Sequence, residues 1–250
     1  MMFITATAEW LAHKNGKQLC YPNAKEQFEH ISTSFKWTEH AEEYHSIFKY
    51  IDWFKNQDMR GHIRDVVQIP FRYIEFSPKD GTEYRGYFQS ERNFDGDFAR
   101  ELFTPTNRVT DEVNKYQALY NEGSATSIHV RRGNYLDLRD HHIVQPMSYY
   151  EDAMEVLDDK TDWYLVFSDD IEWCRGNFIG NNFIFVQDTD YVEMFLMSKC
   201  TNNIIANSSF SWWGAFLGDP NGRTVIAPKD WFPNNNPNAS DIVPEYWIKL

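Results

Sequence analysis

The sequence predicts an α/β protein of two domains, the second built on a parallel sheet. From residue 124 onward, strand-like apolar runs alternate with helix-like segments, and this alternation is typical of βαβ units. One of these runs, at 125–130, contains β-branched residues and leads directly into Arg131 and Arg132. Open α/β sheets bind ligands beyond the carboxyl ends of their strands, so the arginine pair is expected at a ligand site.

The first 123 residues are expected to form the smaller domain. Residues 1–13 carry apolar side chains at helical spacing, and Asn15-Gly16 is a helix stop. Thr104 and Pro105 combine a capping hydroxyl with a proline at the first helical position, so a second helix begins there and ends at Gly123. Residues 26–56 show weak periodicity and are assigned to helices and loops only loosely. The strands expected in this domain are at 19–21, 66–76 and 84–88, with a turn at 78–81.

Residues 124–250 are expected to form the second domain, which is more regular. Its expected strands are at 125–130, 163–167, 183–186, 203–206 and 224–227. Its expected helices are at 147–157, 169–177, 191–199 and 209–217. Because a helix lies between each strand and the next, the strands are expected to pair in parallel, as in a Rossmann-type sheet.

The composition indicates a folded, acidic protein. Hydrophobic residues make up 42% of the 250 residues, and the formal net charge is −13. Binding to phosphate backbones requires a basic surface, so no nucleic-acid partner is expected. No apolar run approaches the ~20 residues of a membrane span, and the N-terminus lacks the residue order of a signal peptide. A cytoplasmic protein is expected, and peripheral association with a membrane stays open.

Arg131 and Arg132 provide two guanidinium groups in this acidic chain. A guanidinium presents a fixed fork of donors that matches phosphate oxygens, so the pair is suited to clamp a diphosphate. The alternative is a pair of surface residues in ordinary ion pairs, which is the more common situation for an isolated Arg-Arg dipeptide. The other motifs of the chain favour the diphosphate site.

Several longer motifs occur along the chain. They are Gly86-Tyr87-Phe88-Gln89-Ser90-Glu91, the run from Ser127 to Tyr135, Ser168-Asp169-Asp170, Trp173-Cys174, the run from Ile205 to Ala215, Val225-Ile226-Ala227-Pro228 and Trp231-Phe232. In these motifs the sequence resembles the α-1,2-fucosyltransferases of glycosyltransferase family 11, over most of the chain from Gly86 to Phe232. Several long motifs in the same order are much more specific than any one of them.

The resemblance implies a GT-B-like fold with two Rossmann-type α/β domains. It also implies inverting transfer of L-fucose from GDP-β-L-fucose to a sugar hydroxyl of a galactoside-type acceptor, with an α-1,2 linkage, without a cofactor or metal ion. Members of this family usually open with a strand and a Gly-Gly-x-Gly-Asn-Gln loop, whose glycines allow close approach to a phosphate. Since these glycines are absent, the N-terminal domain is expected to lack its first strand and Gly-rich loop.

Two alternatives to fucosyl transfer stay open. One is a transferase that uses another sugar nucleotide on the same framework, because details of the pocket set the donor. The other is a catalytically impaired protein that binds GDP or a glycan, which the missing glycines and Asn134 suggest. The resemblance associates the position of Asn134 with aspartate, and asparagine cannot act as a base.

The turn between the strand at 203–206 and the following helix is a second expected part of the donor site. Free backbone N–H groups and the helix dipole attract a phosphate there, and Ser208 and Ser209 add hydroxyl donors. One of these serines is also expected to be the N-cap of the helix. The resemblance implies that Ser208, Ser209 and Phe210 hold the diphosphate together with Arg131. The donor-binding residues further include Arg132, His129, Asp169 and Glu193.

The acidic donor-site residues have different expected roles. Asp169 and Asp170 follow a strand and open a helix, so one of them is expected to cap that helix, and a metal-binding role is rejected. The resemblance places Glu193 against guanine, where a carboxylate accepts two N–H donors, although an exposed helical glutamate is the alternative. His129 is expected to contact the base or brace Arg131, or else to be a satisfied core histidine.

Acceptor binding is assigned to Gln89 and Glu91, whose polar groups are suited to face a sugar. A strand followed by an ordinary helix cap explains the same residues equally well.

Catalysis is assigned to Arg131 and Asp137. Arg131 stabilises the negative charge that develops on the leaving GDP, and a base takes the acceptor proton. Asp137 is the candidate base, but the sequence does not settle this role, because Asp140, His141 and His142 lie in the same loop and the whole loop is equally consistent with solvation.

Overall fold

The computed structural model describes residues 1–22, 47–52, 55–120, 123–233 and 239–250, which form two compact units. Unit 1 comprises Met1–Thr106 and Asn238–Ile242, and unit 2 comprises Asn107–Pro237 and Val243–Leu250. This division, between residues 106 and 107, lies upstream of the boundary that the sequence predicted, which is after residue 123. The reason is that helix α5 (Asn107–Gln117) packs on helix α8 (Asp190–Lys199) of unit 2.

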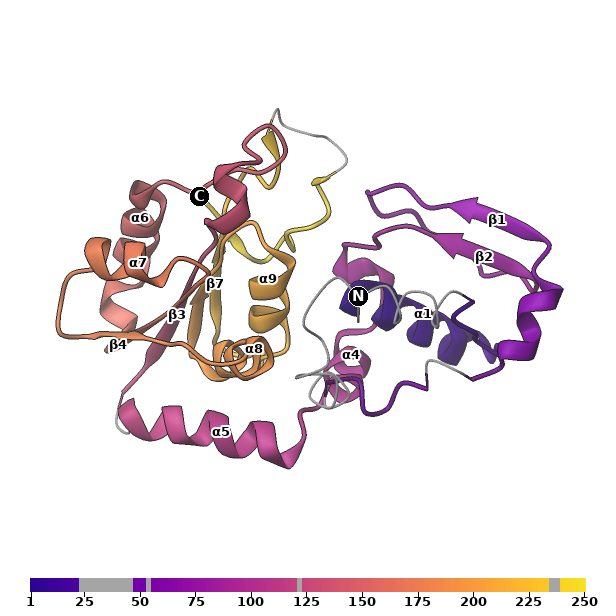
Figure 1. The fold of residues 1–250 in the computed structure, drawn as a ribbon, viewed down its shortest axis with the longest axis horizontal. Helices are drawn as coiled ribbons and strands as arrows, with labels where there is room; N and C mark the ends of the chain where they lie inside the picture. The colour runs from indigo at the N-terminus through magenta and orange to yellow at the C-terminus, as the bar shows by residue number, and fades with distance from the viewer. Residues whose placement is uncertain (23–46, 53–54, 121–122, 234–238) are drawn as a thin grey trace. The chain divides into compact units, whose positions relative to one another are not determined.

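The described part of unit 2 contains a six-stranded parallel sheet (Figure 1). Its strands are β3 (Ala125–Val130), β4 (Trp163–Ser168), β5 (Phe183–Phe185), β6 (Asn202–Ile204), β7 (Thr224–Ala227) and β8 (Ile248–Lys249). They lie in the order β5-β4-β3-β6-β7-β8, and every neighbouring pair is parallel. Counted from β3, this is the order 3-2-1-4-5-6 of doubly wound sheets. The predicted α/β fold class is confirmed, and β8 was not predicted because a strand of that length carries no periodicity.

Helices cover both faces of this sheet (Figure 1). On one face lie α6 (Met147–Leu157) and α7 (Ile171–Asn177), and on the other lie α8 and α9 (Ser209–Phe216), which pack against each other. All residues of β3 are buried, as expected for a central strand covered on both sides.

Alternation along β3 decides which of its side chains face α6 and α7 and which face α8 and α9. Ile128 and Val130 join the apolar cluster under α6 and α7. Ser127 and His129 therefore point to the opposite face, because successive residues of a strand alternate. There Ser127 Oγ accepts a hydrogen bond of 2.6 Å from Asn203 Nδ2, and the ring of His129 lies against Phe210 of α9.

Helix α9 packs against α8 at a glycine that leaves no room for a side chain. A Cβ at Gly214 would come within 2.9 Å of the Cβ and Sδ atoms of Met197. Trp212 and Trp213 beside it are buried in the core of unit 2. This packing fixes the position of the α9 N-terminus relative to β6.

The described residues of unit 1 contain a parallel strand pair, β1 (Asp65–Gln68) and β2 (Thr82–Arg85), and the contacting helices α1 (Met2–Asn15) and α4 (Gly96–Leu102). Helix α1 ends as the sequence predicted, with Gly16 in the left-handed conformation at φ 60°. None of the described helices is long and apolar enough to cross a membrane.

Several boundaries predicted in the first 123 residues are wrong. Residues 19–21 form no strand, because this segment folds back on α1, where the Tyr21 hydroxyl donates to Glu9. The strand predicted at 66–76 ends at Gln68, since Pro70 has no N–H to continue the ladder. The strand predicted at 84–88 is β2, which ends before the backbone turns left-handed at Phe88. The helix predicted to begin at Thr104-Pro105 is α5 and begins at Asn107. The loose assignment at 26–56 falls mostly outside the described residues.

Candidate functional site

The carboxyl ends of β3 and β6 form the switch point of the sheet. The chain leaves β3 toward α6 on one face and leaves β6 toward α9 on the other, which is the arrangement that opens a ligand-binding crevice. The segment after β3 contains Arg131 and Arg132, and the segment after β6 contains Ser208. These segments are directly connected, because the Tyr135 hydroxyl donates to the Asn207 carbonyl oxygen at 3.2 Å. The structure thus brings together residues that are more than seventy positions apart.

Arg131 is the more accessible of the two arginines. Its Nη1 lies 3.1 Å from Asp169 Oδ2, its Nη2 donates to Asn134 Oδ1 at 2.7 Å, and its guanidinium lies over the Tyr135 ring. Its side chain is 34% exposed. A guanidinium has five N–H donors, so these contacts orient Arg131 and leave donors for an anion.

Arg132 is instead held by the protein. Its Nε donates to Asp170 Oδ2 at 3.0 Å, its guanidinium stacks over Trp173 at 4.1 Å, and its side chain is 17% exposed. Its backbone N–H donates to Asp169 Oδ1 at 2.9 Å. The structure therefore separates the predicted clamp into one arginine that faces the switch point and one that anchors β3 to α7.

The two aspartates after β4 are engaged by these arginines. Asp170 is the N-cap of α7 and accepts the Trp173 N–H at 3.3 Å, as predicted for one of the pair. Asp169 bridges Arg131 and the backbone of Arg132, and a Cβ at Gly133 would collide with its carboxylate. Among the described residues, no group of three His, Cys, Asp or Glu side chains is arranged to hold a metal ion.

The turn after β6 begins α9. Ser208 is the N-cap, and its hydroxyl accepts the Phe210 N–H at 3.3 Å, whereas Ser209 is exposed. Asn207 is fixed by Trp231, whose carbonyl accepts from Nδ2 at 3.1 Å. The Ser208 hydroxyl is thus partly used by the helix, and the Ser209 hydroxyl is open.

His129 is a buried histidine with an unsatisfied atom. It is 4% exposed, its ring centroid lies 5.4 Å from that of Phe210, and its Nδ1 has no hydrogen-bond partner among the described residues. Burial, helped by the charge of Arg131, lowers the pKa of His129 to about 3, so the ring is neutral at pH 7. The expectation of a satisfied core histidine does not hold for Nδ1. A buried polar atom without a partner is costly, so Nδ1 is a candidate contact for a bound ligand or water.

Glu193 lies in the first turn of α8. It is half-buried, and its Oε1 accepts the Asp188 N–H at 3.0 Å. Burial, with the charges of Asp188 and Asp190, raises the pKa of Glu193 to about 7, against the opposing effect of that N–H. Its hydrogen bond ties it to the turn between β5 and α8 and leaves one carboxylate oxygen for another donor.

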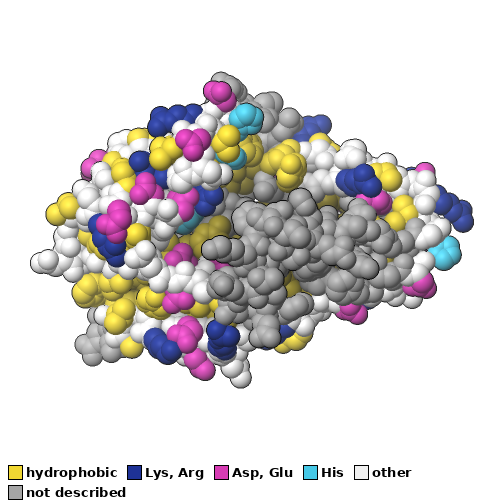
Figure 2. Space-filling model, viewed as in Figure 1, with side chains coloured by type: hydrophobic (Ala, Val, Ile, Leu, Met, Phe, Trp, Pro, Cys, Tyr) yellow, Lys and Arg dark blue, Asp and Glu magenta, His cyan; other side chains and the backbone are white. Residues whose placement is uncertain are grey.

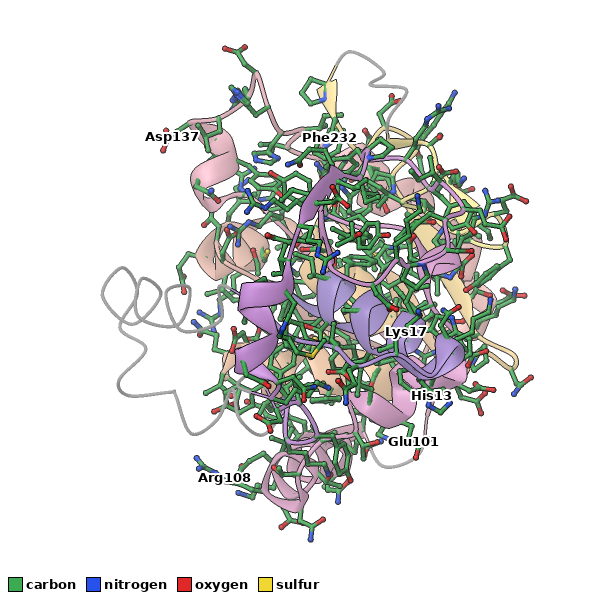
Figure 3. The ribbon with its side chains drawn as sticks, turned by 90° about the vertical axis from the view of Figure 1, so that its right-hand side faces the viewer. His13, Lys17, Glu101, Arg108, Asp137 and Phe232 are labelled. Carbon is green, nitrogen blue, oxygen red and sulfur yellow. The ribbon has the colours of Figure 1, made fainter. Side chains whose placement is uncertain are left out.

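The loop after β3 contains the candidate bases. Asp137 follows the short helix η5 (Gly133–Leu136), and its exposed side chain projects away from the ribbon in Figure 3. Asp140 and His141 are also exposed. His142 is half-buried and its ring stacks on Tyr135, with centroids 4.1 Å apart and an interplanar angle of 6°. Burial, then His141 and Arg131, lower the pKa of His142.

Gln89 and Glu91 lie in unit 1 and are both half-buried. Between them, Ser90 caps the short helix η3 (Glu91–Asn93) by accepting the Arg92 N–H at 3.3 Å. The cap that the sequence left as an alternative is therefore present, and Gln89 precedes it.

Doubly wound sheets that collect ligand-binding groups at the switch point define a class of nucleotide-binding α/β domains, and unit 2 has this topology. Within that class the family is clear from sequence. The chain belongs to glycosyltransferase family 11, whose model, described as glycosyl transferase family 11, matches residues 30–250. The resemblance inferred from the motifs is confirmed.

Two relatives come from Escherichia coli. The O-antigen biosynthesis glycosyltransferase WbnK is 33% identical over 190 residues, covering 69% of this chain and 62% of the relative. An alpha-1,2-colitosyltransferase is 36% identical over 194 residues, covering 71% of this chain and 65% of the relative. The chain therefore spans less than two thirds of the length of these relatives. Among solved structures, fucosyltransferase NodZ from Bradyrhizobium is 13% identical with a TM-score of 0.40, covering 59% of this chain and 55% of that chain.

Proposed function

We propose that this chain is a glycosyltransferase that moves L-fucose from GDP-β-L-fucose to a hydroxyl of a galactoside-type acceptor, with inversion and an α-1,2 linkage. Membership of glycosyltransferase family 11 supports glycosyl transfer. A bovine galactoside alpha-(1,2)-fucosyltransferase 1 is 27% identical over 120 residues, 44% of this chain and 33% of the relative, which supports the linkage and the sugar. The observation that carries the proposal is Arg131, an oriented and accessible cation at the switch point.

The donor would be held by groups from three segments. Arg131 would bind the β-phosphate, and the open Ser209 hydroxyl and the α9 N-terminus would add donors. The unsatisfied Nδ1 of His129 would accept a hydrogen bond from the nucleotide, or donate one to it in the tautomer that carries the proton on Nδ1. Three other residues would position these groups without contacting the donor. Arg132 would fix α7, Asp169 would fix Arg131, and Ser208 would fix the α9 N-terminus.

Glu193 would recognise guanine. One of its carboxylate oxygens, Oε1, already accepts the Asp188 N–H, and the other has no such bond to a described residue. Together the two oxygens are suited to accept from the adjacent N1–H and N2–H groups of guanine. Binding of two donors would favour the ionised form, against the burial that raises its pKa.

At C1 of the fucose the reaction forms one bond and breaks one, and the acceptor hydroxyl loses its proton to a base. The acceptor oxygen attacks C1 of the fucose, the bond from C1 to the β-phosphate oxygen breaks, and GDP leaves with the electron pair. Arg131 would stabilise the charge on that oxygen through donors that are already oriented. The acceptor proton would pass to Asp137 or to His142, which is the candidate that lies against Tyr135 beside Arg131.

The transfer would proceed without a metal ion. In metal-dependent sugar-nucleotide enzymes, carboxylates hold a divalent ion that neutralises the diphosphate. Here Asp169 and Asp170 are paired with Arg131 and Arg132, so the accessible Arg131 guanidinium would supply that charge.

Colitose is the second candidate sugar. The Escherichia coli alpha-1,2-colitosyltransferase is 36% identical to this chain. Colitose is 3-deoxyfucose, so a site that hydrogen-bonds the fucose 3-hydroxyl would discriminate strongly against it, by leaving its own polar groups unpaired. Competition between GDP-fucose and GDP-colitose in one reaction would decide between the two donors.

Substitution of Arg131 tests the proposal. We expect Arg131→Ala to reduce turnover roughly a hundred- to a thousandfold with an unchanged melting temperature, which is the effect of removing one oriented donor of about 2.7–4 kcal/mol. Arg139→Ala is the matched control, because Arg139 is an exposed arginine of the same loop. Near-normal turnover of Arg131→Ala would overturn the role of Arg131. GDP binding by the wild type without turnover on any acceptor would favour a catalytically impaired protein.

A further inference from the structure

Unit 1 has an aromatic pair, exposed Tyr87 and half-buried Phe71, and Tyr87 lies close in sequence to its candidate acceptor residues. Tyr87 is 64% exposed, and its ring centroid lies 5.1 Å from that of Phe71. Both residues lie outside the strand pair of Figure 1, Tyr87 just after β2 and Phe71 in the connection between β1 and β2. A single exposed aromatic side chain needs no explanation, so the case depends on how this pair is held.

The backbone next to Tyr87 is strained. Phe88 has φ 54°, a left-handed conformation that a bulky residue rarely adopts, and its side chain is only 5% exposed. Asn93 maintains this turn, because its Nδ2 donates to the carbonyl oxygens of Phe88 at 3.1 Å and of Ser90 at 3.2 Å. The turn buries Phe88 and leaves the neighbouring Tyr87 exposed. Strain of this kind persists where the surrounding structure enforces it, and it is concentrated at functional sites.

The segment that carries Phe71 is held as well. Asp241 accepts the backbone N–H of Tyr73 at 2.9 Å and lies 3.9 Å from Arg92, whose guanidinium stacks over the Tyr73 ring at 4.2 Å. Both rings of the pair are therefore attached to fixed backbone. A fixed aromatic surface binds with little loss of conformational entropy, which is what a binding platform requires.

The surroundings of the pair match a sugar more closely than a membrane. A pyranose ring presents C–H groups on one face, which pack on an aromatic ring, and hydroxyl groups around its edge, which need polar partners. Gln89, two positions after Tyr87 and half-buried, is the polar side chain that would serve as such a partner. An anionic membrane would require a basic cluster, but the net charge of the chain is −13, and acidic and basic side chains are interspersed on the face in Figure 2.

We propose that Tyr87 and Phe71 form a platform that binds a sugar ring of the acceptor glycan, with Gln89 beside it. This inference deepens the proposed function and rests on it. It assigns the strained turn at Phe88 a role, since that turn holds Tyr87 in the exposed position. Tyr87 would contribute to acceptor binding and not to donor binding.

The test compares Tyr87→Ala with Tyr87→Trp and Tyr50→Ala in the full chain. Tyr50→Ala is the matched control, because Tyr50 is a 62% exposed tyrosine of the same unit. A galactose-terminated disaccharide is the probe, measured by saturation-transfer NMR without donor and by its KM in the transfer reaction. We expect Tyr87→Ala to weaken disaccharide binding and raise this KM about tenfold, while GDP affinity, kcat and melting temperature stay unchanged. Tyr87→Trp should retain binding.

Each other outcome is decisive. If Tyr87→Ala binds the disaccharide as well as Tyr50→Ala does, the platform is wrong, whether or not transfer occurs. If the wild type binds the disaccharide through Tyr87 but binds no GDP, the platform stands and the proposed function falls. If Tyr87→Ala instead abolishes binding to vesicles of phosphatidylcholine and phosphatidylglycerol, with the disaccharide unaffected, the surface is a membrane contact and the inference is overturned.

Discussion

Replacement of Glu193 by glutamine should make the protein more stable and bind GDP more weakly. The pKa of Glu193 is raised from 4.5 to about 7, so the folded state opposes ionisation of this carboxyl. At 1.36 kcal/mol per pKa unit, the full shift corresponds to an upper limit of roughly 3 kcal/mol. Below pH 4.5 the carboxyl is protonated in both states and costs nothing. The cost grows as pH rises and is complete above about pH 7.

Glutamine removes this cost and keeps an acceptor for the Asp188 N–H. We therefore expect Glu193→Gln to raise the free energy of unfolding by about 1–3 kcal/mol at pH 8 and by much less at pH 5. At pH 8 its GDP affinity should fall about tenfold or more, because the amide sets a donor against a guanine donor, whereas ADP affinity should change little. Urea unfolding at both pH values and calorimetric titration with both nucleotides measure these effects.

Two results would contradict these expectations for Glu193. A stability difference that is the same at pH 5 and pH 8 would show that ionisation of the carboxyl is not its cause. Unchanged GDP affinity would remove Glu193 from the nucleotide site. Glu151→Gln, at an exposed glutamate of α6, controls for the loss of a helical charge.

Three further predictions concern the switch point. Gly133→Ala should destabilise the protein by about 1–3 kcal/mol in urea unfolding and reduce turnover, because the added Cβ displaces Asp169 from Arg131. Full activity of this variant would contradict the role of Asp169 in orienting Arg131. Activity should survive EDTA, whereas loss that manganese restores would show that carboxylates hold a metal. If His142 is the base, His142→Gln should remove the acidic limb of the kcat/KM pH profile. Activity falls on that limb because His142, stacked on Tyr135, is protonated below its pKa, which burial, His141 and Arg131 lower. If Asp137→Asn removes this limb instead, Asp137 is the base.

The sequence predicted the second domain well because its signals are local. Each short apolar run between helices became a strand of the parallel sheet, and Asp170 and Ser208 cap the helices that follow two of them. The first domain was predicted less well. Strand β1 is exposed and β2 is mostly half-buried, and the two pair over a long connection that includes Pro70, so they lack the buried apolar pattern by which strands are recognised.

For the candidate site, the sequence named residues but could not predict their arrangement. Neighbouring positions in sequence suggested that Arg131 and Arg132 act together, but only the fold shows that Arg132 stacks on Trp173 while Arg131 stays accessible. The stacking of His142 on Tyr135 had no sequence signal, because it depends on the path of an irregular loop. The strain at Phe88 was also hidden, since the left-handed conformation is not marked by glycine or asparagine there.

Nucleotide selectivity at the switch point tests the central claim most directly. The measurement is calorimetric titration of the wild type and of Arg131→Ala with GDP, UDP and ADP. We expect the wild type to bind GDP at least about tenfold more tightly than UDP or ADP, since two guanine donors pair with Glu193, and we expect Arg131→Ala to weaken GDP binding. Equal affinities for the three nucleotides, or GDP binding that does not depend on Arg131, would contradict it.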